Sequence, residues 1–153
     1  MVSQSGDDAI RLVVKSADDV TMLSAFLQDG LVAHHDIHFD KARAEVVMVV
    51  DRYRWEASAE CKERVLMGLR IGKVRALLQK QMTNAGGDGG SVFYNLLQLA
   101  YEKEPTRNQE AAGALVFTFS AGATLRLVVD DLMMSAGDIA PPRPAIATPL
   151  HDK

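Results

Sequence analysis

The stretch from Ala114 to Met134 constrains the fold of this chain most strongly. Apolar residues occupy every second position on both sides of a short break at Ala121-Gly122. They are Leu115, Phe117 and Phe119 before the break, and Leu125, Leu127 and Val129 after it. A period of two on both sides of a glycine-containing break predicts a β-hairpin. Such a hairpin indicates a buried core and carries no chemistry of its own.

Length and composition predict one globular domain in a reducing compartment. The chain has 153 residues, of which 48% are hydrophobic and 24% charged. Its single cysteine, Cys61, has no partner for an internal disulfide, and the sequence begins without a basic-then-apolar leader. We therefore expect a cytoplasmic protein. The longest apolar runs reach about half of what a membrane-spanning helix needs, so no membrane partner is expected.

The first regular elements are a strand and a helix. Residues Ile10 to Val14 (IRLVV) predict a short strand. Ser16 can cap a helix over Ala17–Gln28, because Asp18 and Asp19 suit the positive end of the helix dipole. Val20, Leu23 and the Ala25-Phe26-Leu27 run then form one apolar stripe, and Gly30 is the expected stop.

From Leu31 onward the period changes to two, which predicts strands. We expect them over residues 31–39, 44–56, 64–71 and 93–104, followed by the hairpin. The apolar parity changes at Gly72, which indicates a β-bulge or a bend between sheets, and residues 73–82 fit either a strand or a helix. The predicted fold is α+β: a mainly antiparallel β-sandwich or partly open barrel of about six to seven strands, with the helix covering one end or face.

The domain organisation follows from composition. Residues 1–9 predict a flexible N-terminus, residues 10–140 a single α+β domain, and residues 141–153 a proline-rich tail. The glycine-rich segment 83–91 predicts a linker between two three-stranded halves. The halves echo each other, because Phe39 and Phe119 each precede a turn and then VVMVVD or LRLVVD. The preferred interpretation is that apolar strands resemble one another; duplication is the alternative.

Five motifs resemble a known family. They are LVVKSADDVTMLSAFLQDGLV near the start, RYRWE at Arg52 to Glu56, RVLMGLRI, NLLQLAYE and the hairpin end LRLVVDD. In these motifs and in the order of its elements, the chain from Ile10 to about Ala140 resembles DUF2948, a family of uncharacterised proteins found mainly in alphaproteobacteria. The resemblance implies a small cytoplasmic bacterial protein of unknown function. It provides no catalytic residues to transfer to this chain.

Three side chains on one predicted strand raise the question of a metal site. His34, Asp36 and His38 would share one face of the strand over residues 31–39. At ~3.3 Å per residue, His34 and His38 would lie ~13 Å apart, which is too far for one ion. A solvated strand face is the preferred interpretation, so neither a metal nor any other cofactor is expected.

Other reactive residue types lack the neighbours that chemistry needs. The Gly86–Gly90 segment has neither the P-loop lysine nor the dinucleotide spacing, which favours a linker. Asp130-Asp131 has no clear acid/base partner, and Cys61 lies among charged residues without an identifiable base. We therefore predict no catalytic residues, and a non-enzymatic binding or protein-interaction module is the preferred function.

A basic pair of strands provides the candidate ligand site: Arg52, Arg54, Glu56, Arg64 and Arg70. Pairing strand 44–56 with strand 64–71, with Tyr53 and Trp55 turned to the core, places the four arginines on the opposite face. Like charges side by side need acidic partners or an anionic ligand. Ion pairs to Glu45, Glu56 or Glu63, or plain solvation, are one interpretation. The functional alternative is an enzyme or ligand-binding protein that holds a phosphate or carboxylate metabolite through Arg52 and Arg54.

The charge distribution bears on partners. Residues 41–82 hold ten Lys or Arg against five acids, whereas the rest of the chain holds seven against fifteen. This asymmetry can complement itself between two copies, so we expect a homodimer. A nucleic-acid partner is not expected, because the whole chain is acidic and the basic strands lack an exposed aromatic platform.

Overall fold

The computed structural model describes residues 2–4, 9–57, 60, 62–82, 92–103 and 113–145. These residues form one α-helix and twelve strands, and the strands make up a single sheet in which every pairing between described strands is antiparallel. The strands are β1 (Val2–Gln4), β2 (Ile10–Val14), β3 (Gly30–Ala33), β4 (Ile37–Asp40), β5 (Glu45–Tyr53), β6 (Glu63–Ile71), β7 (Val74–Lys80), β8 (Phe93–Lys103), β9 (Gly113–Phe119), β10 (Thr124–Val129), β11 (Met134–Asp138) and β12 (Arg143–Pro144). The α+β class and the antiparallel sheet are confirmed, but the predicted six to seven strands are too few.

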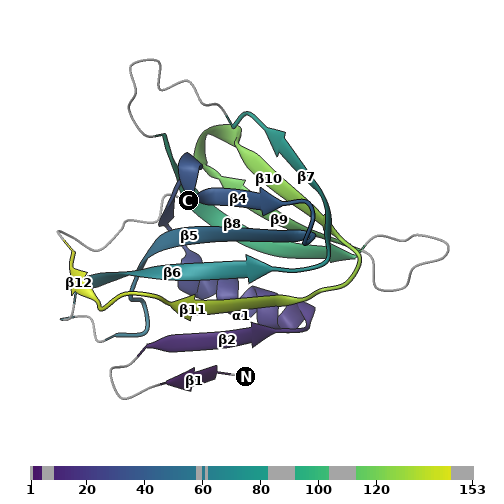
Figure 1. Ribbon diagram of the computed structural model, residues 1–153. Coiled ribbons are helices and arrows are strands. Elements are labelled where there is room, and N and C mark those ends of the chain that lie inside the picture. The colour runs from purple at the N-terminus through teal and green to yellow at the C-terminus, as the bar shows by residue number, and fades with distance from the viewer. Residues whose placement is uncertain are drawn as a thin grey trace.

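The helix α1 (Ala17–Leu27) begins where its cap predicts. The hydroxyl of Ser16 accepts a hydrogen bond from the backbone N–H of Asp19 at 3.2 Å, which satisfies a free donor of the first turn. Val20, Leu23 and Leu27 are buried, and the helix contacts β8, β5 and β2. Figure 1 shows it behind β6 and β11, so it covers one face of the curled sheet.

The end of the helix corrects the predicted role of Gly30. The residue with the left-handed backbone is Asp29, with φ 62°, and Gly30 is already the first residue of β3. A Cβ at Gly30 would lie 2.5 Å from Val50 Cγ1 and 2.9 Å from the Leu27 carbonyl oxygen. Glycine is therefore needed here for the close approach of β3 to β5, not for its freedom of φ.

The strand predicted over residues 31–39 is two strands. Ala33 at the end of β3 pairs with Phe93 of β8, whereas Ile37 at the start of β4 pairs with Met48 of β5. β3 also pairs with β5 at Leu31 and Asp51, and a 3₁₀ turn, η1 (His34–Asp36), separates β3 from β4. His34, Asp36 and His38 therefore do not share one strand face, because the turn breaks the period of two.

The sheet order explains why the barrel is not closed. From one edge the path runs β1-β2-β11-β6-β5-β3-β8-β9-β10-β7, and β4 pairs with β5 beside this path. The sheet also contains two antiparallel three-stranded runs, β4–β5–β6 and β8–β9–β10, and the second of them includes the predicted hairpin of β9 and β10. Residues 73–82 contain a strand and not a helix, and Gly72-Lys73 forms a bend between β6 and the far edge strand β7.

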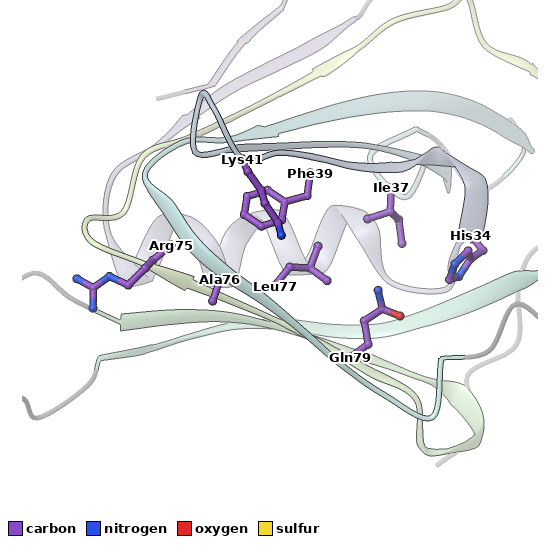
Figure 2. Close-up of a pocket in the computed structure, with 8 residues that line it drawn as sticks. All are labelled: His34, Ile37, Phe39, Lys41, Arg75, Ala76, Leu77 and Gln79. Atoms are coloured by element: carbon purple, nitrogen blue, oxygen red, sulfur yellow. The ribbon is translucent and has the colours of Figure 1, made fainter.

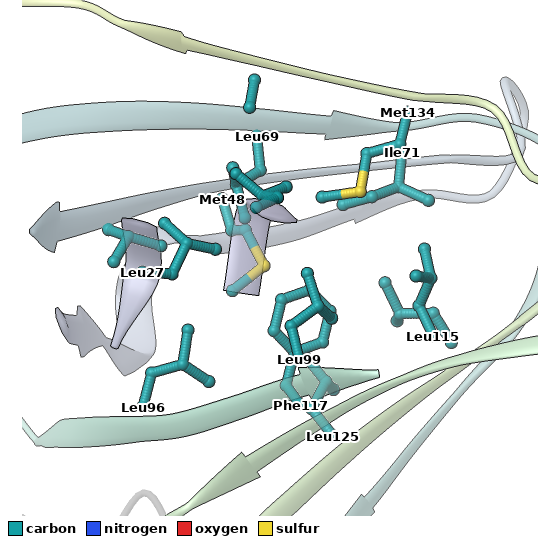
Figure 3. Close-up of a cluster of buried hydrophobic side chains, with 14 of the residues drawn as sticks. Leu27, Met48, Leu69, Ile71, Leu96, Leu99, Leu115, Phe117, Leu125 and Met134 are labelled. Atoms are coloured by element: carbon teal, nitrogen blue, oxygen red, sulfur yellow. The ribbon is translucent and has the colours of Figure 1, made fainter. Parts of the chain in front are cut away.

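The core lies inside the curl of the sheet. Its side chains come from strands distant in the path, and Figure 3 shows ten of them converging: Leu27, Met48, Leu69, Ile71, Leu96, Leu99, Leu115, Phe117, Leu125 and Met134. All ten are buried. The alternating positions of the predicted hairpin, including Leu115, Phe117 and Leu125, therefore face this core, as the period of two indicates.

Both ends of the chain contribute short strands. Val2–Gln4 pairs with β2 although residues 1–9 predict a flexible terminus, and Arg143–Pro144 pairs with β6 within the proline-rich stretch 141–153. The predicted linker over residues 83–91 lies outside the described residues, as do Cys61 and the Gly86–Gly90 segment. Among the described helices, none is long and apolar enough to cross a membrane.

Candidate functional site

The predicted basic strand pair exists, but its faces are reversed at Arg52. β5 and β6 pair antiparallel over eight positions, with Val50 opposite Met67 and Arg52 opposite Val65. Because Val46, Met48 and Val50 point into the core, the period of two also turns Arg52 inward, where its exposure is 0%. Tyr53 lies opposite Arg64 on the other face, and Trp55 follows the end of β5. Tyr53 is nevertheless buried, at 4% exposure, and Trp55 is half-buried. The prediction that all four arginines share one outer face is wrong, because Arg52 is buried.

The buried guanidinium of Arg52 is fully engaged within the chain. Its Nε and Nη2 donate to the two carboxylate oxygens of Asp138 at 3.1 and 2.8 Å. Its Nη1 and Nη2 donate to the two carboxylate oxygens of Glu56 at 2.8 and 3.0 Å, and Nη1 also reaches the Tyr53 carbonyl at 3.4 Å. These bonds use all five N–H donors of an arginine. The Phe26 ring, 5.8 Å from the guanidinium carbon, covers one face of the group.

Asp138 connects this cluster to strands β2 and β11. It sits inward at the end of β11, opposite Met67 of β6, and is itself buried. Its second oxygen also accepts the backbone N–H of Ile10 at 2.9 Å, at the start of β2. One carboxylate thus ties β2, β5 and β11 together. Sequence analysis missed Asp138, because a carboxylate in the third inward position of MSAGD hides the apolar alternation of β11.

The remaining predicted site residues also pair with carboxylates. Arg54 contacts Glu63 and lies 3.4 Å from Glu56, Arg64 lies 3.3 Å from Asp51, and Arg70 lies 2.9 Å from Glu45. The predicted ion pairs with Glu45, Glu56 and Glu63 are therefore present. Ligand binding by Arg52, Arg54, Glu56, Arg64 and Arg70 stays a prediction, and Arg52 would have to release a carboxylate to take part.

Electrostatics in the cluster favour the charged forms. Burial acts to raise the pKa of Glu56, but the hydrogen bond from Arg52 and the charges of Arg52 and Arg54 outweigh it, so the pKa lies below its usual range. Burial likewise acts to lower the pKa of Arg52, yet the bonds to Glu56 and Asp138 raise it. The pairing of Arg52 with Glu56 thus favours the charged form of both groups.

This network predicts a pH dependence of stability. Because the pKa of Glu56 is lower in the folded chain than its ordinary 4.5, the unfolded chain binds more protons between these two values. The stabilisation is present above pH 4.5 and is lost as the pH falls through the folded value. We measure the unfolding free energy by urea titration at a series of pH values. Below pH 4.5, we expect this free energy to fall less steeply with decreasing pH in Glu56→Gln than in the parent chain. Equal slopes for the variant and the parent chain would contradict this assignment.

The other candidate chemistry does not assemble. Among the residues that the structure describes, no three His, Cys, Asp or Glu side chains are placed to hold a metal ion. Asp130 contacts Arg75, and the carboxylate of Asp131 accepts the backbone N–H of Leu132 at 2.8 Å. The hairpin's acidic end thus makes local contacts, in line with a structural role.

An apolar groove crosses the outer face of β2, β11, β6 and β5, which we call the outer groove. Two adjoining hollows of about 550 and 600 Å³ share Val13, Arg70 and Ser135 in their walls. Their other lining residues include Val47, Val49, Gly68, Gly137, Ile139 and Met133. Val13, Met133 and Ile139 are 50%, 56% and 59% exposed, although they are large apolar side chains.

A second opening lies where the sheet fails to close, between β4 and β7. We call it the seam cleft. It has a volume of about 470 Å³ and is lined by His34, Ile37, Phe39, Lys41, Arg75, Ala76, Leu77 and Gln79. Figure 2 shows the amine of Lys41 and the amide of Gln79 pointing into the space between the strands, whereas the guanidinium of Arg75 points away. No local sequence signal could have identified it, because it depends on which strands fail to pair.

Comparison with known proteins identifies the family and goes no further. No curated protein and no solved structure matches this chain. One family does match, over residues 10–151, and its description is "Protein of unknown function (DUF2948)". The resemblance carried by the RYRWE and LRLVVDD motifs is thereby confirmed. Because the match covers nearly all of the 153 residues, the chain belongs to DUF2948.

Proposed function

We propose that this protein is a non-enzymatic cytoplasmic interaction module that associates with a second copy of itself through the outer groove. The observation that carries the proposal is the gathering of Val13, Met133 and Ile139, each at least half exposed, around one hollowed sheet face. Exposed apolar patches of this kind mark interaction surfaces on soluble proteins. The single cysteine supports a reducing compartment.

Two glycines beneath the groove leave room for the exposed apolar side chains above them. A Cβ on Gly68 would lie 3.2 Å from Ile139 Cγ2, and one on Gly72 would lie 3.2 Å from Met133 Sδ. The missing side chains therefore let Ile139 and Met133 lie flat on the sheet. A partner would meet a broad apolar surface instead of a row of isolated side chains, and flat sheet faces pack well against one another.

Charge favours a second copy as the occupant. Around the groove, Arg11, Lys15 and Lys73 supply positive charge and Asp131 supplies negative charge. In a two-fold interface the same patch is used by both copies, so Asp131 of each copy can face one of these cations of the partner. The basic segment 41–82 and the acidic remainder extend this complementarity to the whole chain.

The test is the molar mass in solution. By light scattering during gel filtration we expect a dimer for the parent chain and a monomer for the Val13→Asp, Ile139→Asp double variant. Leu78→Asp is the matched control, because Leu78 is 52% exposed but lies on β7 away from the groove. Raising the salt should promote dissociation, since exposed pairs are screened beyond ~10 Å at 0.1 M. A monomer for the parent chain at tens of micromolar would refute the proposal, and a salt-insensitive dimer would assign the interface to apolar contacts alone.

Recognition of a small anionic metabolite through Arg52 and Arg54 is the second candidate. It is supported by the concentration of arginines near Glu56, and is weakened because Arg52 is buried and saturated. A thermal-shift screen of phosphates and carboxylates tests it. Reproducible stabilisation that Arg54→Ala abolishes would favour ligand binding over a purely structural network.

A further inference from the structure

The seam cleft lies between two sheet edges for which the described residues provide no strand neighbour. Along residues 37–40, β4 pairs only with β5, and β7 pairs only with β10. The strands approach at one end, where the backbone N–H of Val74 donates to the carbonyl of Ala44 at 2.8 Å. Beyond that bond, no ladder joins β4 to β7 among the described pairings. Edges of this kind carry free backbone donors and acceptors, which are a template for another strand.

The cleft between these edges combines an apolar base with a few polar groups. Ile37, Phe39 and Leu77 line it and pack against the core. Leu77 and Gln79 pair with Leu127 and Leu125, so the period of two places both on the inner face of β7, where Leu77 is half-buried and Gln79 is exposed. An apolar side chain of a bound segment would therefore find apolar contacts, and a polar one would find Gln79.

Lys41 and His34 are the polar residues of the cleft whose positions bear on what it could bind. Lys41 forms no ion pair among the described residues, and its amine points into the cleft (Figure 2). His34 is held by a hydrogen bond between its Nδ1 and the Tyr94 hydroxyl at 2.9 Å, and the Tyr94 ring in turn contacts Phe119. This bond fixes the imidazole ring at the open end of the cleft. A cation without an acidic partner favours an occupant that supplies a carboxylate.

We propose that the seam cleft receives an extended, acidic peptide segment of another protein, which adds as a strand to the edges of β4 and β7. Backbone hydrogen bonds to the edges would supply affinity, alternate apolar side chains would enter between Phe39 and Leu77, and a carboxylate would meet Lys41. The four residues of β4 set the paired length at ~13 Å. This site is separate from the outer groove, so it does not depend on self-association.

A peptide fits these observations better than a small molecule does. A small carboxylate could contact Lys41 and the apolar base, but it would leave both strand edges unpaired. An extended backbone satisfies them over several residues at once, and period-two side chains match a cleft that is apolar on its inner side. The proposal therefore predicts that affinity depends on the main chain of the occupant as well as on its charge.

The experiment uses the full chain labelled with ¹⁵N and a blocked pentapeptide of alternating valine and glutamate. We expect saturable amide shifts centred on β4 and β7. N-methylation of the peptide backbone should weaken binding at least about tenfold, because it removes strand pairing. Lys41→Glu should also weaken it about tenfold and should instead favour the same peptide with lysine in place of glutamate. Lys80→Glu is the matched control, because Lys80 is an exposed cation on β7 that does not line the cleft.

Three results would overturn the proposal. They are the absence of saturable shifts in β4 and β7, equal binding of the N-methylated peptide, and equal shifts and affinity with hexanoate, which would assign the cleft to small carboxylates. Repeating the titration with the Val13→Asp, Ile139→Asp variant separates this site from the dimer interface. Peptide binding should persist in that variant whether or not the parent chain is a dimer.

Discussion

The Asp138→Ala variant is expected to lose about 3–5 kcal/mol of unfolding free energy, which is the usual cost of removing one partner of a buried ion pair. The substitution leaves the guanidinium of Arg52 at 0% exposure with only Glu56 to balance it. It also removes the acceptor of the Ile10 N–H, so the start of β2 loses a bond to the sheet. Both groups are buried and cannot turn to water, which is why the loss is large.

Urea denaturation at neutral pH measures this loss. Two further variants serve as controls. Glu45→Ala breaks the Glu45–Arg70 pair, whose arginine is 59% exposed, and should cost at most about 1 kcal/mol. Combining Arg52→Met with Asp138→Leu removes the buried charges together and should recover part of the stability, because apolar replacements of a buried pair are often neutral. A loss of less than about 1 kcal/mol for Asp138→Ala would mean that the cluster does not hold β2, β5 and β11 together.

Local features of the sequence predicted local features of the fold. The cap at Ser16, strand β2, the pairing of β5 with β6 and the hairpin of β9 and β10 all follow from periods and turn residues within about twenty positions. These elements can be predicted because each has a local sequence pattern. A strand shows alternating apolar residues, and the start of a helix shows a hydroxyl residue followed by acidic residues. The helix stop was misassigned to Gly30, since its role depends on Val50 in a distant strand.

The sequence does not show on which face of β5 the side chain of Arg52 lies. The VVMVV run of β5 is apolar on both sides, so its alternation does not say which side is buried. Tyr53 is buried as its hydrophobicity predicts, but Arg52 is buried as well, because Asp138 neutralises its charge. Those two residues are 86 positions apart, and β11 carries too little apolar pattern to show that it pairs beside β6. The residue types of the candidate site could thus be predicted from the sequence. Its geometry could not, because it depends on the pairing of β11 with β6.

The seam cleft and the outer groove illustrate the same limit. Among the described residues, each forms where a neighbouring strand or side chain is missing, and the alternation of apolar residues along one strand does not show which strands or side chains lie beside it. The edge position of β7 follows from the sharp bend at Gly72-Lys73, where Lys73 has φ 58°, and the parity change there did indicate a bend. What the sequence could not supply is that the bend sends β7 to pair with β10, which leaves its other edge facing β4.

The Phe117→Ala variant is the second substitution with a large expected effect, and it tests the hairpin that organises the core. Phe117 is fully buried on β9, pairs with Leu125 of β10 and Leu99 of β8, and lies in the centre of the cluster in Figure 3. Removing its ring leaves a cavity that rigid neighbouring strands cannot fill. We expect a loss of about 3–5 kcal/mol in unfolding free energy.

Phe93→Ala provides the matched control, because it makes the same chemical change on β8 at a side chain that is 59% exposed. Its cost should be about 1 kcal/mol or less, since little apolar surface returns to water. Denaturant titrations of both variants against the parent chain give the comparison directly. If the two losses were equal, Phe117 would not face the interior, and the register that pairs Leu125 with it would have to shift by one residue, which reverses every side chain of the strand.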